Sequence, residues 1–492
     1  MAGIGFELKK LFEKKGVFAL LKAYGYAGVI TTGPMILGMA LLVGIQAISK
    51  MAGLSLAKQD LLTCMMMYTL LVSMIVTNVC GMVVTRYTAD CLYEDKQEKV
   101  IPSLYGSLTL MMILGGVIYG AFLFFSDIPF DYAILLFMIL EELIVVWTQM
   151  NYLTAIKDYK GILGAFMLAL FVGISFVYVC TCLLDFPVIT TLLSCVAISY
   201  GMMIVWYHIL LRKFFPNIKG SKVEFIRSFE KYPALIGCGF FMTIGLYGHL
   251  ILMWGSDIGN HIHGLFYAAP QYDVPALMAF LSTLVTTINF VTSVEVNFYP
   301  KYRTYYSLFN DEGTLRDIEQ AERELRTTLQ DELAYNAAKQ VFVTIVFIVL
   351  GTILLPKLPL GFNEHMLGVF RVLCLGYAFY AIGNSVMLMT LYFSDEKGAF
   401  WSTLTFAVTS VLATIVFEFL PVQYNGFGFV IGAACFMIVA IGRLWYYQRR
   451  ISYYVLATQP MIQKVYHGPF TKIADYFMNR AEEKKWKKDE KE

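Results

Sequence analysis

The lysine and arginine residues of this chain sort to one side of its apolar stretches. If the N-terminus is cytoplasmic, the connections on that side carry 34 of the 38 basic residues, and the positive-inside rule then places both termini in the cytoplasm. The other four are Lys50, Lys58 and Lys357 in outer loops and Arg371 within a span. Each stretch is near the roughly 20 residues that a helix needs to cross a bilayer. The twelve predicted spans cover residues 23–48, 61–84, 104–125, 132–156, 161–184, 188–211, 233–254, 266–294, 337–355, 366–393, 398–420 and 427–447.

Composition agrees with an all-α membrane protein. Hydrophobic residues make up 58% of the chain and charged residues 15%, whereas a soluble domain carries about 25% charged residues. The net charge of +2 predicts no nucleic-acid partner. Basic residues instead gather in the two tails, at Lys9 to Lys15 and at Lys484 to Lys491, where contact with membrane lipid or recruitment of a cytosolic partner would explain them.

The chain repeats itself around a basic connection, residues 212–232, with six spans before it and six after. Asp158-Tyr-Lys-Gly161 closes the connection between spans four and five, and Asp395-Glu-Lys-Gly398 closes the one between spans ten and eleven. An even number of spans in each half gives both halves the same orientation, so the pattern predicts two six-helix halves related by a parallel pseudo-two-fold axis, with a site between them. The predicted organisation is an amphipathic segment 1–22, an N-lobe 23–211, a linker 212–232, a C-lobe 233–447 with a cytoplasmic loop 295–336, and a basic cytoplasmic tail 448–492.

Ionisable side chains within spans are costly unless they face water or a partner, which makes them candidate transport residues. Glu141 and Glu142 lie near the middle of span four. Adjacent helical positions point about 100° apart, so both can face the bundle interior only at its edges. We expect at least one of them to line an aqueous cavity; a buried, protonated or paired carboxyl is the alternative.

The second half supplies further cavity candidates. Arg371 in span ten could meet an acid across a central cleft or extend to the outer interface. Asp273 stands between Pro270 and Pro275, which predicts a broken or kinked segment whose freed carbonyls line a cavity. Asn78 and Asn289 either join helices by hydrogen bonds or line a path for sugars.

The loop 295–336 contains a predicted helix. Thr314 to Asp317 form a capping box, and the pairs Glu319/Arg323 and Glu322/Arg326 have i,i+4 spacing. The apolar stripe of this helix consists of Leu315, Ile318, Leu325 and Leu329. The helix either lies on the bilayer or the bundle, or it docks a partner, and Ile318 and Leu325 are the docking candidates.

Missing motifs narrow the function. The dipeptide Gly-Lys does not occur, which excludes a Walker A loop, and neither a His-Glu-x-x-His nor a Gly-x-Ser-x-Gly motif is present. The nine cysteines form no disulfide or metal-binding framework, because nearly all fall in spans. The sequence therefore predicts no cofactor, no metal and no enzymatic activity.

Twelve spans in two parallel halves resemble the multidrug/oligosaccharidyl-lipid/polysaccharide flippase superfamily, with its Wzx-type and MATE-type transporters. The opening Met1 to Leu11 (MAGIGFELKKL), followed by Tyr24-Gly-Tyr-Ala-Gly28 and Thr32-Gly-Pro34, resembles the PelG family more specifically. That resemblance extends to about residue 455 and leaves the tail outside it.

The resemblance implies export of an amino-sugar exopolysaccharide, Pel, across the inner membrane during production of the biofilm matrix. It implies two partners, a cytosolic glycosyltransferase and a cyclic-di-GMP-binding membrane scaffold. Acids at Glu141 and Glu142 would suit a cationic polymer, whereas an anionic lipid-linked substrate would favour basic side chains. An ion-coupled MATE-type antiporter, a lipid-linked oligosaccharide flippase, and a membrane-embedded enzyme or scaffold remain the alternatives.

Overall fold

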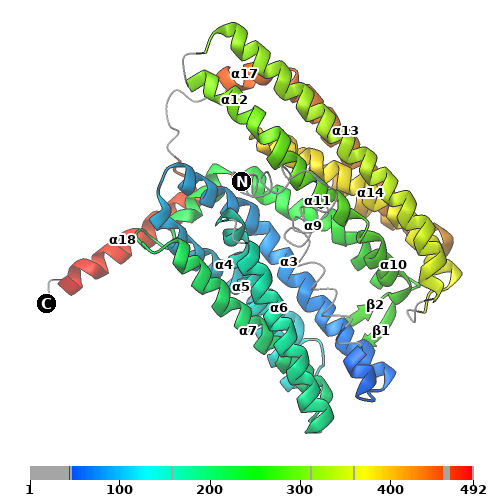
Figure 1. Ribbon diagram of the computed structural model, residues 1–492. Coiled ribbons are helices and arrows are strands. Elements are labelled where there is room, and N and C mark those ends of the chain that lie inside the picture. Colours follow the sequence, from blue (N-terminus) through cyan, green and yellow to red (C-terminus); the bar gives the residue numbers. More distant parts are fainter. Residues whose placement is uncertain are drawn as a thin grey trace. The chain divides into compact units, whose positions relative to one another are not determined.

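The structure is a computed structural model that describes most of the chain in helices (Figure 1). The described residues are 44, 47–156, 159–184, 186–310, 313–357, 361–457 and 466–489. They form two compact units, each of which is described separately. The N-terminal unit comprises Pro34–Phe240, His261–Tyr267 and Gln463–Glu492, and the C-terminal unit includes Phe241–Asn260 and Ala268–Ile462.

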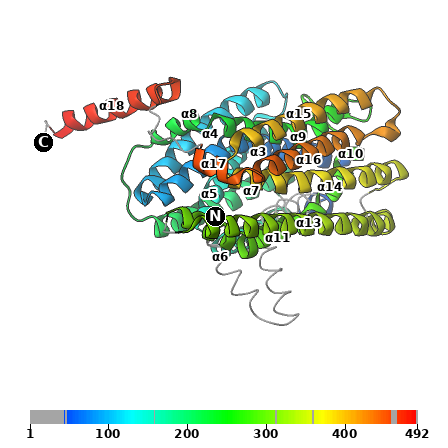
Figure 2. The same ribbon diagram turned by 90° about the horizontal axis from the view of Figure 1, so that it is seen from above.

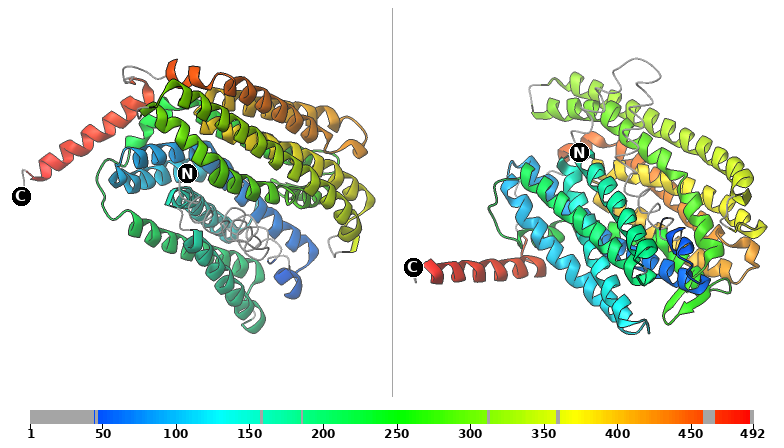
Figure 3. Two further views of the ribbon diagram at one scale, coloured as in Figure 1. Left: turned by 45° about the horizontal axis from the view of Figure 1, so that its top comes forward. Right: turned by 60° about the horizontal axis from the view of Figure 1, so that its bottom comes forward.

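The N-terminal unit is a helical bundle in which α5 is the central helix, because it contacts α3, α4 and α7. Helices α3 to α7 run side by side in Figures 1 and 3. A π-helical turn, Val179–Leu183, follows α6. The helices of this unit are α3 (Leu56–Tyr93), α4 (Val100–Phe124), α5 (Phe130–Ile156), α6 (Tyr159–Tyr178), α7 (Val188–Phe214), α8 (Arg227–Lys231), the start of α9 (Pro233–Trp254) and α18 (Pro469–Asp489).

A short β-hairpin between α9 and α10 completes the N-terminal unit, although its neighbours in the chain belong to the other unit. Its strands are β1 (Asn260–His263) and β2 (Phe266–Ala268). The hydroxyl of Tyr68 on α3 donates to the Tyr267 carbonyl at 3.0 Å, and His263 Nε2 lies 2.8 Å from the carbonyl oxygen of Asp127. Phe266 is fully buried and packs edge-on against the stacked rings of Tyr68 and Phe122. The hairpin is therefore held to the bundle through β2, whereas three of the four residues of β1 are exposed.

The C-terminal unit contains two pairs of closely packed helices, α15 with α16 and α14 with α16. Figure 2 shows α13 and α14 side by side in the same unit. Short 3-10 turns follow α13 and precede α16. The helices are the remainder of α9, α10 (Pro270–Phe280), α11 (Thr283–Ser293), α12 (Tyr299–Asn310), α13 (Leu315–Leu354), α14 (Glu364–Tyr392), α15 (Glu396–Glu418), α16 (Phe427–Gln448) and α17 (Ile451–Ala457).

Glycines allow α16 to approach α15 closely. A Cβ at Gly428 would stand 2.4 Å from the Cα atom of Thr414, and one at Gly432 would stand 2.5 Å from the Cα atom of Ser410. Small residues four apart on both helices form the contact that membrane helices commonly use, since it lets backbones meet without displacing side chains. The start of α15 is fixed as well, because Asp395 accepts a hydrogen bond from the Gly398 amide and pairs with Arg443 at 2.5 Å.

Ten helices of the described chain are long and apolar enough to cross a membrane, which agrees with a multi-pass membrane protein. Most of the predicted first span lies outside the described residues, and α5, which corresponds to the predicted fourth span, is not among the ten. The eighth span is broken, as Pro270 and Pro275 indicate, although the interruption falls at residues 281–282, between α10 and α11. The predicted loop helix and ninth span are one continuous helix, α13, of 40 residues. The helix continues through its polar first half without interruption, whereas hydropathy alone divides it into a loop helix and a span.

Candidate functional site

The two acids of α5 lie on opposite flanks of that helix. Glu141 is directed toward α4, where its Oε1 atom is 2.6 Å from the position that a Cβ on Gly116 would take. Glu142 is directed toward α7, where its Oε1 atom is 3.5 Å from the corresponding position at Gly201. The two side chains point in different directions because adjacent positions on a helix are about 100° apart. On each neighbouring helix a glycine, which has no side chain, leaves room for the carboxylate.

Both acids are half-buried and incompletely hydrogen-bonded. The Oε2 atom of Glu141 and the Oε2 atom of Glu142 are buried without a hydrogen-bond partner in the described part of the chain. No lysine or arginine among the described residues forms an ion pair with either. Burying an unsatisfied carboxyl group costs several kcal/mol, so the pair is an unusual feature of a membrane helix.

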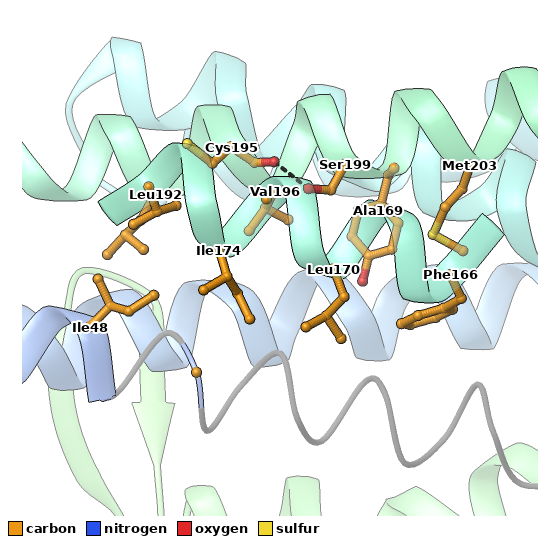
Figure 4. Close-up of a pocket in the computed structure, with 14 residues that line it drawn as sticks. Ile48, Phe166, Ala169, Leu170, Ile174, Leu192, Cys195, Val196, Ser199 and Met203 are labelled. Carbon is orange, nitrogen blue, oxygen red and sulfur yellow. Dashed lines mark hydrogen bonds between the residues drawn. The ribbon is translucent and has the colours of Figure 1, made fainter. Parts of the chain in front are cut away.

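A cavity of about 50 Å³ lies beside α6 and α7 of the N-terminal unit (Figure 4). Its described lining is apolar, for example Phe166, Ile174 and Met203. The Ser199 hydroxyl donates to the Cys195 carbonyl at 2.8 Å and so is already satisfied. The lining includes neither acid of α5, so their predicted role in an aqueous cavity stays a prediction. On its described side this space suits an apolar group rather than a sugar.

Asp273 is held at the start of α10. Its two carboxylate oxygens share the hydrogen of Trp254 Nε1, at 3.0 and 3.1 Å, and Oδ2 also accepts from the Ala269 amide at 2.9 Å. At the break after α10, the hydroxyls of Ser282 and Thr283 donate to the carbonyls of Ala279 and Phe280. These carbonyls are therefore capped within the helix, so the expectation that they line a cavity gains no support.

His249 contacts Tyr272, the residue before Asp273, and was not predicted as a site residue. It is fully buried on α9, and its Nδ1 atom is 2.8 Å from the Tyr272 hydroxyl, while Nε2 has no partner among the described residues. A single histidine in an apolar span gives no spacing pattern, which explains why the sequence did not indicate it.

Asn289 lies at the centre of a polar network that joins α11, α13 and α14. Its amide donates to Asn336 Oδ1 at 2.9 Å, and its Oδ1 accepts from Lys339 Nζ at 2.6 Å. Asn336 in turn donates to Ser385 on α14 at 3.1 Å. Neighbouring contacts, Thr286 with Gln340 and Ser293 with Glu332, extend the seam along α11 and α13.

Asn289 was predicted as a site residue from the sequence, whereas its partners on α13 were not. Glu332, Asn336, Gln340 and Thr344 recur every four residues on α13, a spacing that places them on one helical face. That periodicity is the signal that could have found them. The bonds match interhelical joining, one of the two roles considered for Asn289.

Arg371 and Asn78 have separate surroundings. Arg371 is exposed on α14, and its Nε atom donates to Thr352 Oγ1 on α13 at 3.1 Å. Asn78 is exposed on α3, and its backbone carbonyl oxygen is 2.3 Å from the position that a Cβ on Gly239 would take. Within the C-terminal unit, Asp273, Asn289 and Arg371 thus each bond to different partners.

The docking stripe predicted on α13 needs correction. The capping box is present, because Thr314 and Asp317 bond each other reciprocally, and the pair Glu322/Arg326 forms at 2.6 Å. Leu325, however, is 0% exposed, on a helix that packs against α12. Burial inside the C-terminal unit removes Leu325 from any partner surface, whereas Ile318 is half-buried.

The fold is similar to that of solved MATE-type transporters. A crystal structure of a MATE mutant matches with a TM-score of 0.58 at 13% identity, over 87% of this chain and 96% of that one. An outward-facing multidrug resistance MATE family transporter of the MOP superfamily matches with a TM-score of 0.56 at 14% identity, over 87% and 96%. An inward-facing form matches with 0.56 at 12% identity, over 84% and 94%. These similarities establish the fold.

The family follows from sequence. No curated protein sequence matches the chain. The family model described as "PelG: Putative exopolysaccharide Exporter (EPS-E)" matches residues 1–456, so the chain belongs to the PelG family. It is a multi-pass membrane protein of an exopolysaccharide-exporting family, as the opening residues predicted.

Proposed function

We propose that this chain moves an amino-sugar exopolysaccharide, Pel or a Pel-like polymer, out of the cytoplasm through the inner membrane, with both termini cytoplasmic. Twelve spans in two six-helix halves, related by a parallel pseudo-two-fold axis, would carry the path. The family match over residues 1–456 is the observation that carries the proposal. The sorting of basic residues supports the orientation.

The charges of the span residues support a substrate with positive groups. Glu141 and Glu142 have buried carboxylate oxygens without partners in the described part of the chain, which an amino or hydroxyl group of a sugar could satisfy. Arg371 is exposed, and its Nε atom donates to Thr352 on the neighbouring helix α13. Acids without basic partners favour a cation over an anion.

Replacing the acids tests this role. We expect Glu141→Gln with Glu142→Gln to stop secretion of the polymer at an unchanged amount of membrane protein, because the amide removes the charge at nearly the same volume. Glu418→Gln, at the end of α15, is the matched control and should secrete normally. Normal secretion from the double variant would refute the role of the acids without bearing on the family.

An ion-coupled antiporter or a lipid-linked oligosaccharide flippase is the alternative, favoured by the MATE-type fold. Inside-out vesicles, whose cytoplasmic face is turned outward and supplied with the components of polymer synthesis, distinguish them. Uptake of polymer that needs ongoing synthesis supports the exporter, whereas uptake of small cations driven by an imposed proton or sodium gradient supports the antiporter. Comparing free-amine and N-acetylated oligosaccharides as competitors would report whether the positive charge matters.

Synthesis is the energy source that we propose, since the sequence has no Walker A motif. A cytosolic glycosyltransferase and a cyclic-di-GMP-binding membrane scaffold would then dock at the cytoplasmic end. Within the predicted docking stripe of α13, the accessible positions are the exposed Leu315 and the half-buried Ile318. Ile318→Glu should reduce co-purification of the glycosyltransferase, with Leu315→Ala as a milder variant of the same face; equal recovery from wild type and both variants would place docking elsewhere.

A further inference from the structure

The helix α18 lies beyond the family match, which ends at residue 456, and it has two different faces. One face is attached to the linker between the predicted halves. Glu230 on α8 accepts hydrogen bonds from the Thr471 amide at 3.1 Å and from its hydroxyl at 2.7 Å. Arg227 forms an ion pair with Asp475, and Phe229 meets Phe470.

Burial and charge indicate that this attachment is specific. Ala474 is fully buried and Thr471 nearly so. A Cβ at Gly468 would collide with Glu230 Oε1, so glycine is required just before the helix. The hydroxyl of Thr471 holds the pKa of Glu230 below its usual range.

The linker is in turn fixed to the bundle. Lys231 and the Tyr232 hydroxyl contact Asp90 at the end of α3, at 3.0 and 2.6 Å. Glu224 pairs with Lys99 at 2.6 Å. Helix α18 is therefore attached to the N-terminal unit at the end where α3 finishes and α4 begins. In Figure 1 and in both views of Figure 3 it leaves that end sideways rather than continuing along the bundle.

The other face of α18 is apolar and exposed. Ile473 is 45%, Tyr476 60% and Phe477 49% exposed. At 100° per residue these positions lie away from Thr471 and Ala474, which face the linker. Three large apolar side chains thus share one exposed face of a helix outside the spans, where water contact is unfavourable.

The sequence continues this stripe with basic residues. Arg480, Lys484 and Lys488 recur at i+3, i+7 and i+11 from Phe477. A helix with an apolar face and flanking lysines lies in the interface of a bilayer, where the apolar groups enter the headgroup region and the lysines reach the phosphates. The end of α3 to which it is attached is the predicted cytoplasmic surface, whose lipids are anionic.

We propose that the exposed face of α18 binds the anionic surface of the membrane next to the bundle, anchoring the inter-half linker to the lipid headgroups. The occupant is the phosphate-bearing lipid surface rather than a protein. The apolar stripe, the basic residues that continue it and the sideways path of the helix are all consistent with α18 lying in the plane of the membrane surface, next to the inner ends of the spans. The inference is independent of the exported substrate and depends on the predicted cytoplasmic C-terminus.

Hydrogen exchange of the full-length protein in nanodiscs tests it. Nanodiscs of phosphatidylcholine alone are compared with nanodiscs that also contain phosphatidylglycerol. We expect the amides of residues 476–488 to be protected more strongly with the anionic lipid. Each lysine near such a surface contributes about 1 kcal/mol, or roughly fivefold in binding, so Lys484→Gln with Lys488→Gln should lower the protection many-fold.

Two further variants separate lipid binding from other effects. Ile473→Ala with Phe477→Ala should also lose the protection, whereas Lys472→Gln, which removes an exposed charge outside the stripe, should not. Amides near Thr471 and Ala474 should stay protected in every variant, which shows that α18 is still attached. Equal protection in both kinds of nanodisc would overturn the proposal, as would protection that arises only when soluble cell protein is added, because a protein would then be the partner.

Discussion

Leu325 distinguishes internal packing from partner docking on α13. Its side chain is 0% exposed, whereas Leu315, ten residues earlier on the same helix, is 74% exposed. Truncating a fully buried leucine to alanine costs about 2–5 kcal/mol, and truncating an exposed one costs about 0.5 kcal/mol or less. Leu325→Ala should therefore loosen the contact of α13 with α12, while Leu315→Ala should leave it intact.

Limited proteolysis measures that difference locally. Trypsin can cut at Arg323 and Arg326 only when this part of α13 opens, and its cutting rate follows the population of the open form. A loss of about 2 kcal/mol raises that population roughly thirtyfold. We expect cleavage of Leu325→Ala to accelerate by that factor or more, in detergent and without any partner present.

The result that refutes the reasoning is equally specific. Similar cleavage rates for Leu325→Ala and Leu315→Ala would mean that Leu325 is not buried in the protein. A rate that changes only when the glycosyltransferase is added would return Leu325 to a docking role.

Three further predictions concern the other contacts. Asn336→Leu should cost about 1 kcal/mol, since membrane hydrogen bonds average about 0.6 kcal/mol and this residue makes two; thermal unfolding in detergent would record it, and no change would contradict the polar seam. Gly432→Val should sharply reduce the amount of folded protein, because the valine side chain would collide with the Ser410 backbone. Fluorescence-detected gel filtration would measure that amount, with Gly442→Val as the control, because a side chain at Gly442 meets open space. Because the pKa of Glu230 is lowered in the folded state, its bond to Thr471 contributes fully above the ordinary glutamate range of about 4.3 and is lost as the pH falls through the lowered value. The protection factors of the α18 amides, taken relative to the intrinsic exchange rate at each pH, should fall in that acid window for the wild type and fall less for Glu230→Gln.

Sequence reasoning predicted the elements better than their junctions. Hydropathy located the apolar helices, and the residues around Thr314 correctly indicated a capped helix start. Hydropathy divided α13 into a loop helix and a span, because averaging hydropathy over a window does not detect that an amphipathic helix continues directly into an apolar one. The proline pair near Asp273 predicted a broken span, but the break itself lies at residues 281–282.

The candidate site was less predictable because it depends on which neighbour each side chain meets. The spacing of Glu141 and Glu142 predicted divergent directions, yet only the positions of Gly116 and Gly201 show what each one faces. Leu325 fitted an exposed stripe as well as a buried one, since an amphipathic pattern does not say whether its apolar face is covered by the same chain. Asn289 was predicted because it is a polar residue within a span. Its partners on α13 could have been predicted only from the four-residue spacing of polar side chains along that helix.

The hairpin has a consequence for biosynthesis. Residues 261–267 pack against α3 and α4, but the ribosome makes them only after α9, and the chain then returns to the C-terminal unit. The N-terminal unit therefore cannot finish folding when its own helices have been inserted, and it waits for a segment from the second half of the gene product. Helix α18, which is made after the helices of the C-terminal unit, belongs to the same N-terminal unit. The contacts of the first half are thus complete only after the second half has been made, so a chain that stops before the hairpin would leave in the membrane a bundle in which α3 and α4 lack their contact with Phe266.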